Sequence, residues 1–103
     1  MARAVHALLY TAELKTKGYE VSLLFDGAGT EWAMALLNPE HKLNPLYQKL
    51  QNAGVVQIVC DYCSNAFGVR EKLQAEKIVL TAEFEGHPSL VKWLERGYVP
   101  IVL

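Results

Sequence analysis

The chain has 103 residues, 51% of them hydrophobic, and a formal net charge of -1 at pH 7. This length predicts a single domain over 1–103, and the apolar content excludes a disordered chain. There is no basic run and no apolar stretch of membrane-spanning length. We therefore expect no nucleic-acid partner and no membrane association. The N-terminus lacks the apolar core of a signal peptide, so we expect a cytoplasmic protein.

One pattern recurs along the chain: an amphipathic stretch, then a glycine, then an apolar run. The amphipathic stretches have helical periodicity, and a glycine suits the left-handed position that often ends a helix. Asn44 and Pro45 have the residue types of a helix cap and a first helical position. The turn at 26–30 offers Thr30 as a second cap. In chain order, the predicted elements are helix 3–17, strand 19–25, helix 44–53, strand 55–60, helix 64–75, strand 77–80, helix 88–96 and strand 98–103.

The predicted strands are continuous apolar runs, such as 55–60. Such runs are typical of parallel strands that are buried on both faces. Alternating strands and helices predict right-handed crossovers and an α/β fold with three α/β/α layers. We expect a mostly parallel sheet of four to five strands. The chain opens with a helix, whereas a doubly wound domain usually opens with a strand, so an opening strand is expected to be absent here.

The residues best suited to chemistry are Cys60 and Cys63, which form a Cys-x-x-Cys pair at a strand-to-helix junction. Ligands of open α/β sheets bind beyond the carboxyl ends of the strands, where this junction lies. A thiol near a helix N-terminus gains thiolate character, and we expect Cys63 to be the stronger nucleophile. One cysteine could carry a sulfane sulfur while the other resolves it as a disulfide. Alternatively, both are small buried apolar residues.

Two further interpretations of the same edge of the sheet remain open. Asp26, Gly27 and His87 could line a pocket for a small ligand, in a binding module without enzymatic activity. A structural zinc site could use the two cysteines with His41, His87 or Asp26, since two cysteines and two histidines form a known zinc set. No second Cys-x-x-Cys or paired-histidine motif accompanies them. The leading interpretation therefore includes no metal and no cofactor.

Three segments, 25–30, 60–69 and 85–89, together resemble the DsrE-like family of sulfur-relay proteins (DsrE/DsrF/TusD type). The resemblance implies a flavodoxin-like fold and assembly into dimers, trimers or hexamers. It also implies a persulfide carrier or thiol-redox protein, with a sulfurtransferase-like relay between a donor and an acceptor protein. The family's cysteine beyond the strand corresponds to Cys60 or Cys63 here.

Family members begin with an apolar strand inside the sheet, and this sequence begins with the helix that follows it. We expect the resulting gap to be closed by strand 98–103 against strand 21–25, or to be filled by strand exchange between subunits. A small core also favours a homo-oligomer. Trp32, Tyr47 and Trp93 are the aromatic candidates for its interface.

Overall fold

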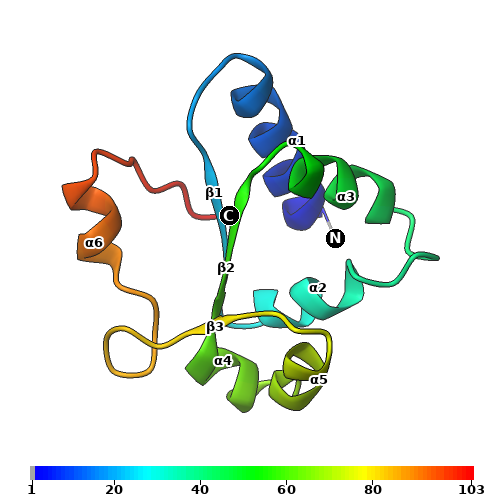
Figure 1. Cartoon of the computed structure of the whole chain (residues 1–103), viewed down its shortest axis with the longest axis vertical. Coiled ribbons are helices and arrows are strands. Elements are labelled where there is room, and N and C mark those ends of the chain that lie inside the picture. The colour runs from blue at the N-terminus through cyan, green and yellow to red at the C-terminus, as the bar shows by residue number, and fades with distance from the viewer. Residues whose placement is uncertain (1) are drawn as a thin grey trace.

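The computed structural model describes residues 2–103, which form a parallel β-sheet with helices on both sides (Figure 1). The helices α1, α2 and α3 lie on one side of the strands, α6 lies on the other, and α4 and α5 lie near the carboxyl ends of the strands. The elements are α1 (Ala2–Thr16), β1 (Ser22–Phe25), α2 (Gly29–Ala35), α3 (Asn44–Asn52), β2 (Val56–Cys60), α4 (Asp61–Ala66), α5 (Arg70–Ala75), β3 (Leu80–Thr81) and α6 (Leu90–Glu95).

The sheet has the order β1-β2-β3, and both pairings are parallel. This confirms the α/β class and is consistent with a flavodoxin-like fold. The expected four to five strands are wrong, because the described residues form three strands. The expected gap does not exist either: β1 pairs directly with β2, so the inner edges of both strands have their hydrogen-bond partners.

The predicted strand 98–103 is also wrong, because this segment forms no ladder and stays irregular. Pro100 lies in its middle, and a proline has no N–H to donate to a neighbouring strand. The closure of this segment onto β1 is therefore not found. The predicted strand 77–80 is displaced to Leu80–Thr81, because Lys77 takes a positive φ of 61° and ends the preceding helical turn.

Local geometry confirms some of the predicted helix ends and corrects others. Gly18 and Gly54 have φ values of 89° and 83°, as expected after a last helical turn. The predicted helix 64–75 is instead two helices, separated at Gly68 with its φ of 74°. Asn44 does not cap α3, because its Nδ2 turns inward and donates to the Leu36 carbonyl at 2.7 Å. Thr30 likewise lies inside α2 and caps nothing.

The core lies between the sheet and the helices α1, α2 and α3. Side chains alternate along a strand, and Leu23, Phe25 and Val59 point to this side of the sheet, where Phe25 and Val59 are paired in register. Tyr47 is 1% exposed and hydrogen-bonds through its hydroxyl to Gln57, so its predicted place at an interface is wrong. The buried cluster consists of Leu8, Phe25, Ala33, Leu36, Tyr47, Leu50, Val59 and Leu73.

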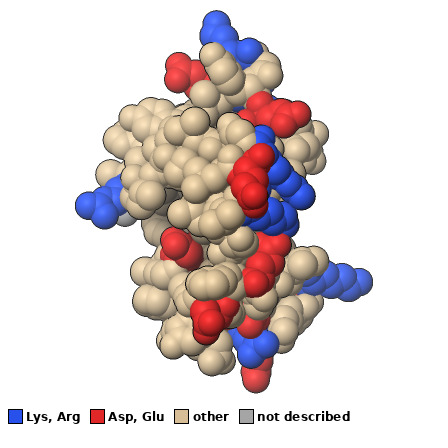
Figure 2. All heavy atoms as spheres, turned by 90° about the vertical axis from the view of Figure 1, so that its left-hand side faces the viewer, with Lys and Arg blue, Asp and Glu red and all other residues tan. Residues whose placement is uncertain are grey.

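The other side of the sheet is covered at Ile58, which is 7% exposed, but is open around it. Leu24 and Val56, which point to this side, are 41% and 51% exposed, and α6 has no buried residue. The terminal segment is apolar and exposed as well, with Val102 at 92%. Figure 2 views the molecule from this side and shows a broad uncharged area with charged side chains mostly along its margin. Within the described residues, no helix is both long and apolar enough to cross a membrane.

Candidate functional site

The two cysteines lie at the junction where β2 becomes α4. Cys60 is the last residue of β2 and the N-cap of α4, with extended backbone angles. Its Sγ accepts a hydrogen bond from the Cys63 N–H at 3.4 Å, in the place where a serine or aspartate oxygen usually caps a helix. The buried Ser64 hydroxyl donates to the Cys60 carbonyl at 2.7 Å. These two bonds fix both cysteines relative to the sheet.

A tight turn over 84–87 brings His87 to the cysteines. The His87 N–H donates to the Phe84 carbonyl at 2.8 Å, and both central residues, Glu85 and Gly86, have positive φ values of 50° and 81°. These angles define a type I′ turn, in which glycine is strongly favoured. The Gly86 carbonyl accepts a hydrogen bond from the Tyr62 N–H at 3.0 Å. That bond attaches the turn to the start of α4.

The base of the turn is held to α6 by a carboxylate. Glu83 accepts hydrogen bonds from the Lys92 ammonium at 2.7 Å and from the Ser89 N–H at 3.1 Å. The bond from Lys92, followed by that from Ser89, lowers the pKa of Glu83. Ser89 also caps α6, because its hydroxyl accepts from the Lys92 N–H at 3.2 Å. The turn that carries His87 is therefore tied at both of its ends.

These elements place three chemically active atoms together. His87 Nδ1 lies 3.1 Å from Cys60 Sγ and 3.8 Å from Cys63 Sγ. One ligand atom from each of the three residues lies within 4.8 Å of the other two. The Tyr62 ring packs on the imidazole, with 4.8 Å between the ring centroids. The site thus combines two thiols with an imidazole nitrogen that can exchange a proton with either of them.

The two cysteines differ in their exposure to solvent. Cys60 is 0% exposed, and this burial raises its pKa from 9.0 to about 11, against the lowering effect of the hydrogen bond from the Cys63 N–H. Cys60 is therefore a neutral thiol near pH 7. Cys63 is partly exposed, so it is the more accessible of the two cysteines.

The other predicted site residues lie at the same edge of the sheet or away from it. Asp26 directly follows β1 and is exposed. Its negative charge is the smallest of the effects that raise the pKa of Cys60. Gly27, with a φ of 52°, forms the turn into α2, and its carbonyl accepts from the Thr30 hydroxyl at 2.9 Å. His41 packs against Trp32 at 5.6 Å, apart from the cysteines. The ligand-binding role of Asp26 and Gly27 stays a prediction.

Some parts of the site have no motif in the sequence that indicates their role. They are Tyr62, Ser64 and Gly86, whose hydrogen bonds hold the cysteines and the turn in place. Gly86 could have been identified as a turn residue, because Gly86, Pro88 and Ser89 form a short cluster of turn-forming residue types. The bond between the Tyr62 N–H and the Gly86 carbonyl joins residues 24 positions apart, and no local pattern indicates it.

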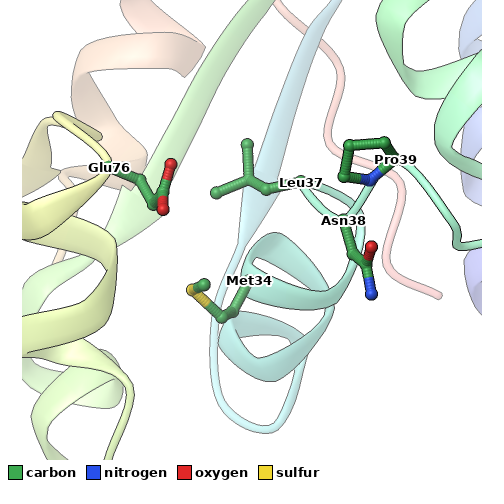
Figure 3. A pocket seen from close by; sticks show the side chains of 5 residues that line it. All are labelled: Met34, Leu37, Asn38, Pro39 and Glu76. Carbon is green, nitrogen blue, oxygen red and sulfur yellow. The ribbon is translucent and has the colours of Figure 1, made fainter.

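A hollow in the surface lies elsewhere. It has a volume of about 460 Å³ and is formed by the end of α2, the loop after it and the end of α5. Figure 3 shows Leu37 and Glu76 facing each other across the hollow, with the Met34 side chain between α2 and α5. Its lining residues are Met34, Leu37, Asn38, Pro39 and Glu76. They include no thiol and no imidazole, so this hollow is separate from the cysteine chemistry.

Comparison with known proteins agrees with this architecture. The model of the DsrE/DsrF-like family matches residues 1–103. An uncharacterized protein of Methanocaldococcus jannaschii, MJ0733, is 37% identical over 94 residues, which cover 91% of this chain and 74% of that protein. No solved structure matches the chain significantly. Because the family match spans every residue, the chain belongs to the DsrE/DsrF-like family.

Proposed function

We propose that this protein carries sulfur as a persulfide on Cys63, with Cys60 as the resolving thiol. The observation that carries the proposal is that Cys63 is partly exposed, with its Sγ 3.8 Å from His87 Nδ1, and lies beside a buried second cysteine. Membership of the family also suggests a role in sulfur relay. The expected partners are a protein that donates sulfur and one that accepts it.

Loading begins when the Cys63 thiol loses its proton, for which His87 Nδ1 is the nearest imidazole acceptor. The thiolate attacks the terminal sulfur of a donor persulfide, as in thiol–disulfide exchange. A bond forms between Cys63 Sγ and that sulfur, the donor's own S–S bond breaks, and the donor leaves as a thiolate. Cys63 then carries one additional sulfur atom.

Two routes can unload that sulfur. An acceptor nucleophile can attack the terminal sulfur, which returns Cys63 to the thiolate. Alternatively, Cys60 gives its proton to His87, 3.1 Å away, and attacks Cys63 Sγ. A Cys60–Cys63 disulfide then forms, and the terminal sulfur leaves as hydrosulfide, so the cysteines are oxidised while the sulfane sulfur is reduced. The high pKa of Cys60 keeps this second route slow at neutral pH and favours direct transfer.

The packing around His87 supports its role as the proton acceptor. Tyr62 covers one face of the imidazole and the type I′ turn fixes its backbone, so Nδ1 stays directed at the two sulfurs. A positioned imidazole typically contributes a factor of about 10²–10⁴ to a proton transfer. The thiols lie at the start of α4, and the imidazole lies in the turn over 84–87. Loading Cys63 with sulfur needs no further group from this chain.

The test is the intact mass of the protein after incubation with a small-molecule persulfide donor. Wild-type protein and Cys60→Ser should each gain one sulfur atom that a reductant removes, whereas Cys63→Ser should gain none. Wild-type protein should also release hydrosulfide and form a disulfide on prolonged incubation, and Cys60→Ser should not. Sulfur gained equally by Cys63→Ser would refute the assignment. No gain by any of the proteins would favour the non-enzymatic ligand-binding module.

A further inference from the structure

We propose that Cys60, Cys63 and His87 also form a zinc site with three protein ligands and one open coordination position. The proposal goes beyond sulfur transfer, because it assigns the same atoms a second occupant. Two thiolate sulfurs and one imidazole nitrogen are the ligand types that zinc prefers in proteins. These three side chains supply them within 4.8 Å of one another.

The distances between the ligand atoms fit one ion. With a zinc–sulfur bond of about 2.3 Å, a zinc–nitrogen bond of about 2.0–2.1 Å and tetrahedral angles, sulfur and nitrogen lie about 3.5 Å apart. The two distances from His87 Nδ1, 3.1 Å to Cys60 Sγ and 3.8 Å to Cys63 Sγ, lie on either side of this value. Shifts of a few tenths of an ångström would therefore bring both sulfur–nitrogen distances to this value. The two sulfurs lie within 4.8 Å of each other and would be about 3.8 Å apart on one tetrahedral ion.

The surroundings of the ligands also suit a metal thiolate. The Cys63 N–H already points at Cys60 Sγ, and an amide that donates to a ligating sulfur stabilises its negative charge. His87 is oriented by the tied turn and by the Tyr62 ring, which reduces the entropy lost when it binds. The site is thus largely formed before any ion binds.

The partial exposure of two of the three ligands indicates a reactive zinc site and not a structural one. Structural zinc sites have four protein ligands, whereas reactive sites have three and leave one position for water or a substrate. Cys63 and His87 are both partly exposed, so solvent reaches the ion from their side. Zinc bound here would occupy Cys63 Sγ and block its loading with sulfur.

The experiment titrates the chelator-treated, reduced protein with Zn²⁺ against a competing colorimetric chelator, and repeats the titration with Co²⁺ as a spectroscopic probe. Wild-type protein should bind one equivalent, and Co²⁺ should give the charge-transfer absorption of a thiolate ligand. Loss of an outer-shell partner weakens metal sites about 10–100-fold. Loss of a direct ligand in Cys60→Ser, Cys63→Ser or His87→Asn should therefore weaken binding by about 100-fold or more.

His41→Asn is the matched control, because His41 is a partly buried histidine outside the cluster, and it should bind zinc like the wild type. Circular dichroism establishes that each variant is folded. Zinc should also protect Cys63 from alkylation. Wild-type affinity in His87→Asn would overturn the three-ligand site, and affinity no higher than that of a Cys60→Ser/Cys63→Ser protein would overturn the proposal. Sulfur loading is measured on metal-free protein, so either proposal can fail alone.

Discussion

The different burial of the two cysteines predicts a large difference in their reactivity. The perturbation is a pair of single variants: Cys63→Ser leaves Cys60 as the only thiol, and Cys60→Ser leaves Cys63. Serine is close in size to cysteine and can keep the cap of α4, because its hydroxyl also accepts from a backbone N–H. Each variant therefore isolates one sulfur with little change to the fold.

The magnitude follows from the raised pKa of Cys60. A pKa raised from 9.0 to about 11 lowers the thiolate fraction near pH 7 by about 100-fold relative to an ordinary thiol. The side chain is also 0% exposed, which further restricts the approach of a reagent. Cys63→Ser removes the contribution of the Cys63 thiol to the raised pKa and keeps the larger contribution of burial. In this variant, alkylation of Cys60 should thus be slower than alkylation of a free model thiol by up to about 100-fold through the pKa alone. The rate should rise about tenfold per pH unit up to the raised pKa.

The assay is the pseudo-first-order rate of iodoacetamide alkylation between pH 6 and pH 10, followed by intact mass. Cys60→Ser should react much faster than Cys63→Ser at every pH below 9. The matched control is each variant in urea, where burial is lost and the two rates should converge. If Cys60 in the folded Cys63→Ser protein reacts as fast as the model thiol, then burial does not control this site and the roles of the two cysteines must be exchanged.

Four further outcomes are expected from the same structure. Gly86→Ala should lower stability by about 1–2 kcal/mol through its φ of 81°, and by more than Gly54→Ala, because only at Gly86 would the new Cβ meet a neighbour, Tyr62 Cβ at 3.3 Å; equal melting temperatures would show that this contact is unimportant. The unfolded chain releases the Cys60 proton near pH 9.0 and the folded chain near pH 11, so stability should fall as the pH rises through this window, and chemical denaturation should show a smaller fall for Cys60→Ser. Leu73→Ala should cost about 2–5 kcal/mol, since Leu73 is 0% exposed, whereas Leu90→Ala at a 60% exposed position should change stability by about 0.5 kcal/mol or less; similar losses would contradict the assigned core. Light scattering should show a homo-oligomer that buries the exposed apolar residues of α6, including Leu90, Val91 and Leu94, and a monomer at every accessible concentration would contradict this.

The α/β class and the order of most elements could be predicted from residue patterns along the chain. Apolar runs that end in Phe25 and Cys60 predicted two parallel strands, and the structure pairs them. Gly18 and Gly54 predicted two helix ends, because a left-handed residue is needed there and glycine adopts it without strain. Cys60 and Cys63 could also be placed at a strand-to-helix junction, because local residue patterns predicted both the strand before them and the helix after them.

The arrangement of the strands in the sheet depends on contacts between distant parts of the chain. An apolar run such as 98–103 is compatible with a strand, but a strand also needs a neighbour with free backbone groups and an unbroken row of N–H donors. Pro100 interrupts that row. The direct pairing of β1 with β2 depends on backbone groups that lie 34 residues apart in register, from Ser22 to Val56, and no local pattern determines which strands become neighbours.

The difference between the two thiols was also decided by tertiary structure. The spacing of Cys60 and Cys63 indicates that they are near each other, but not which one is covered. Burial of Cys60 results from packing at the end of β2, and its pKa follows from that burial. His87 reaches both sulfurs because the Gly86 carbonyl binds the Tyr62 N–H across 24 residues. Local residue patterns specify helices, strands and turns, whereas burial and contacts between distant residues, which determine the chemistry of this site, arise only when those elements pack together.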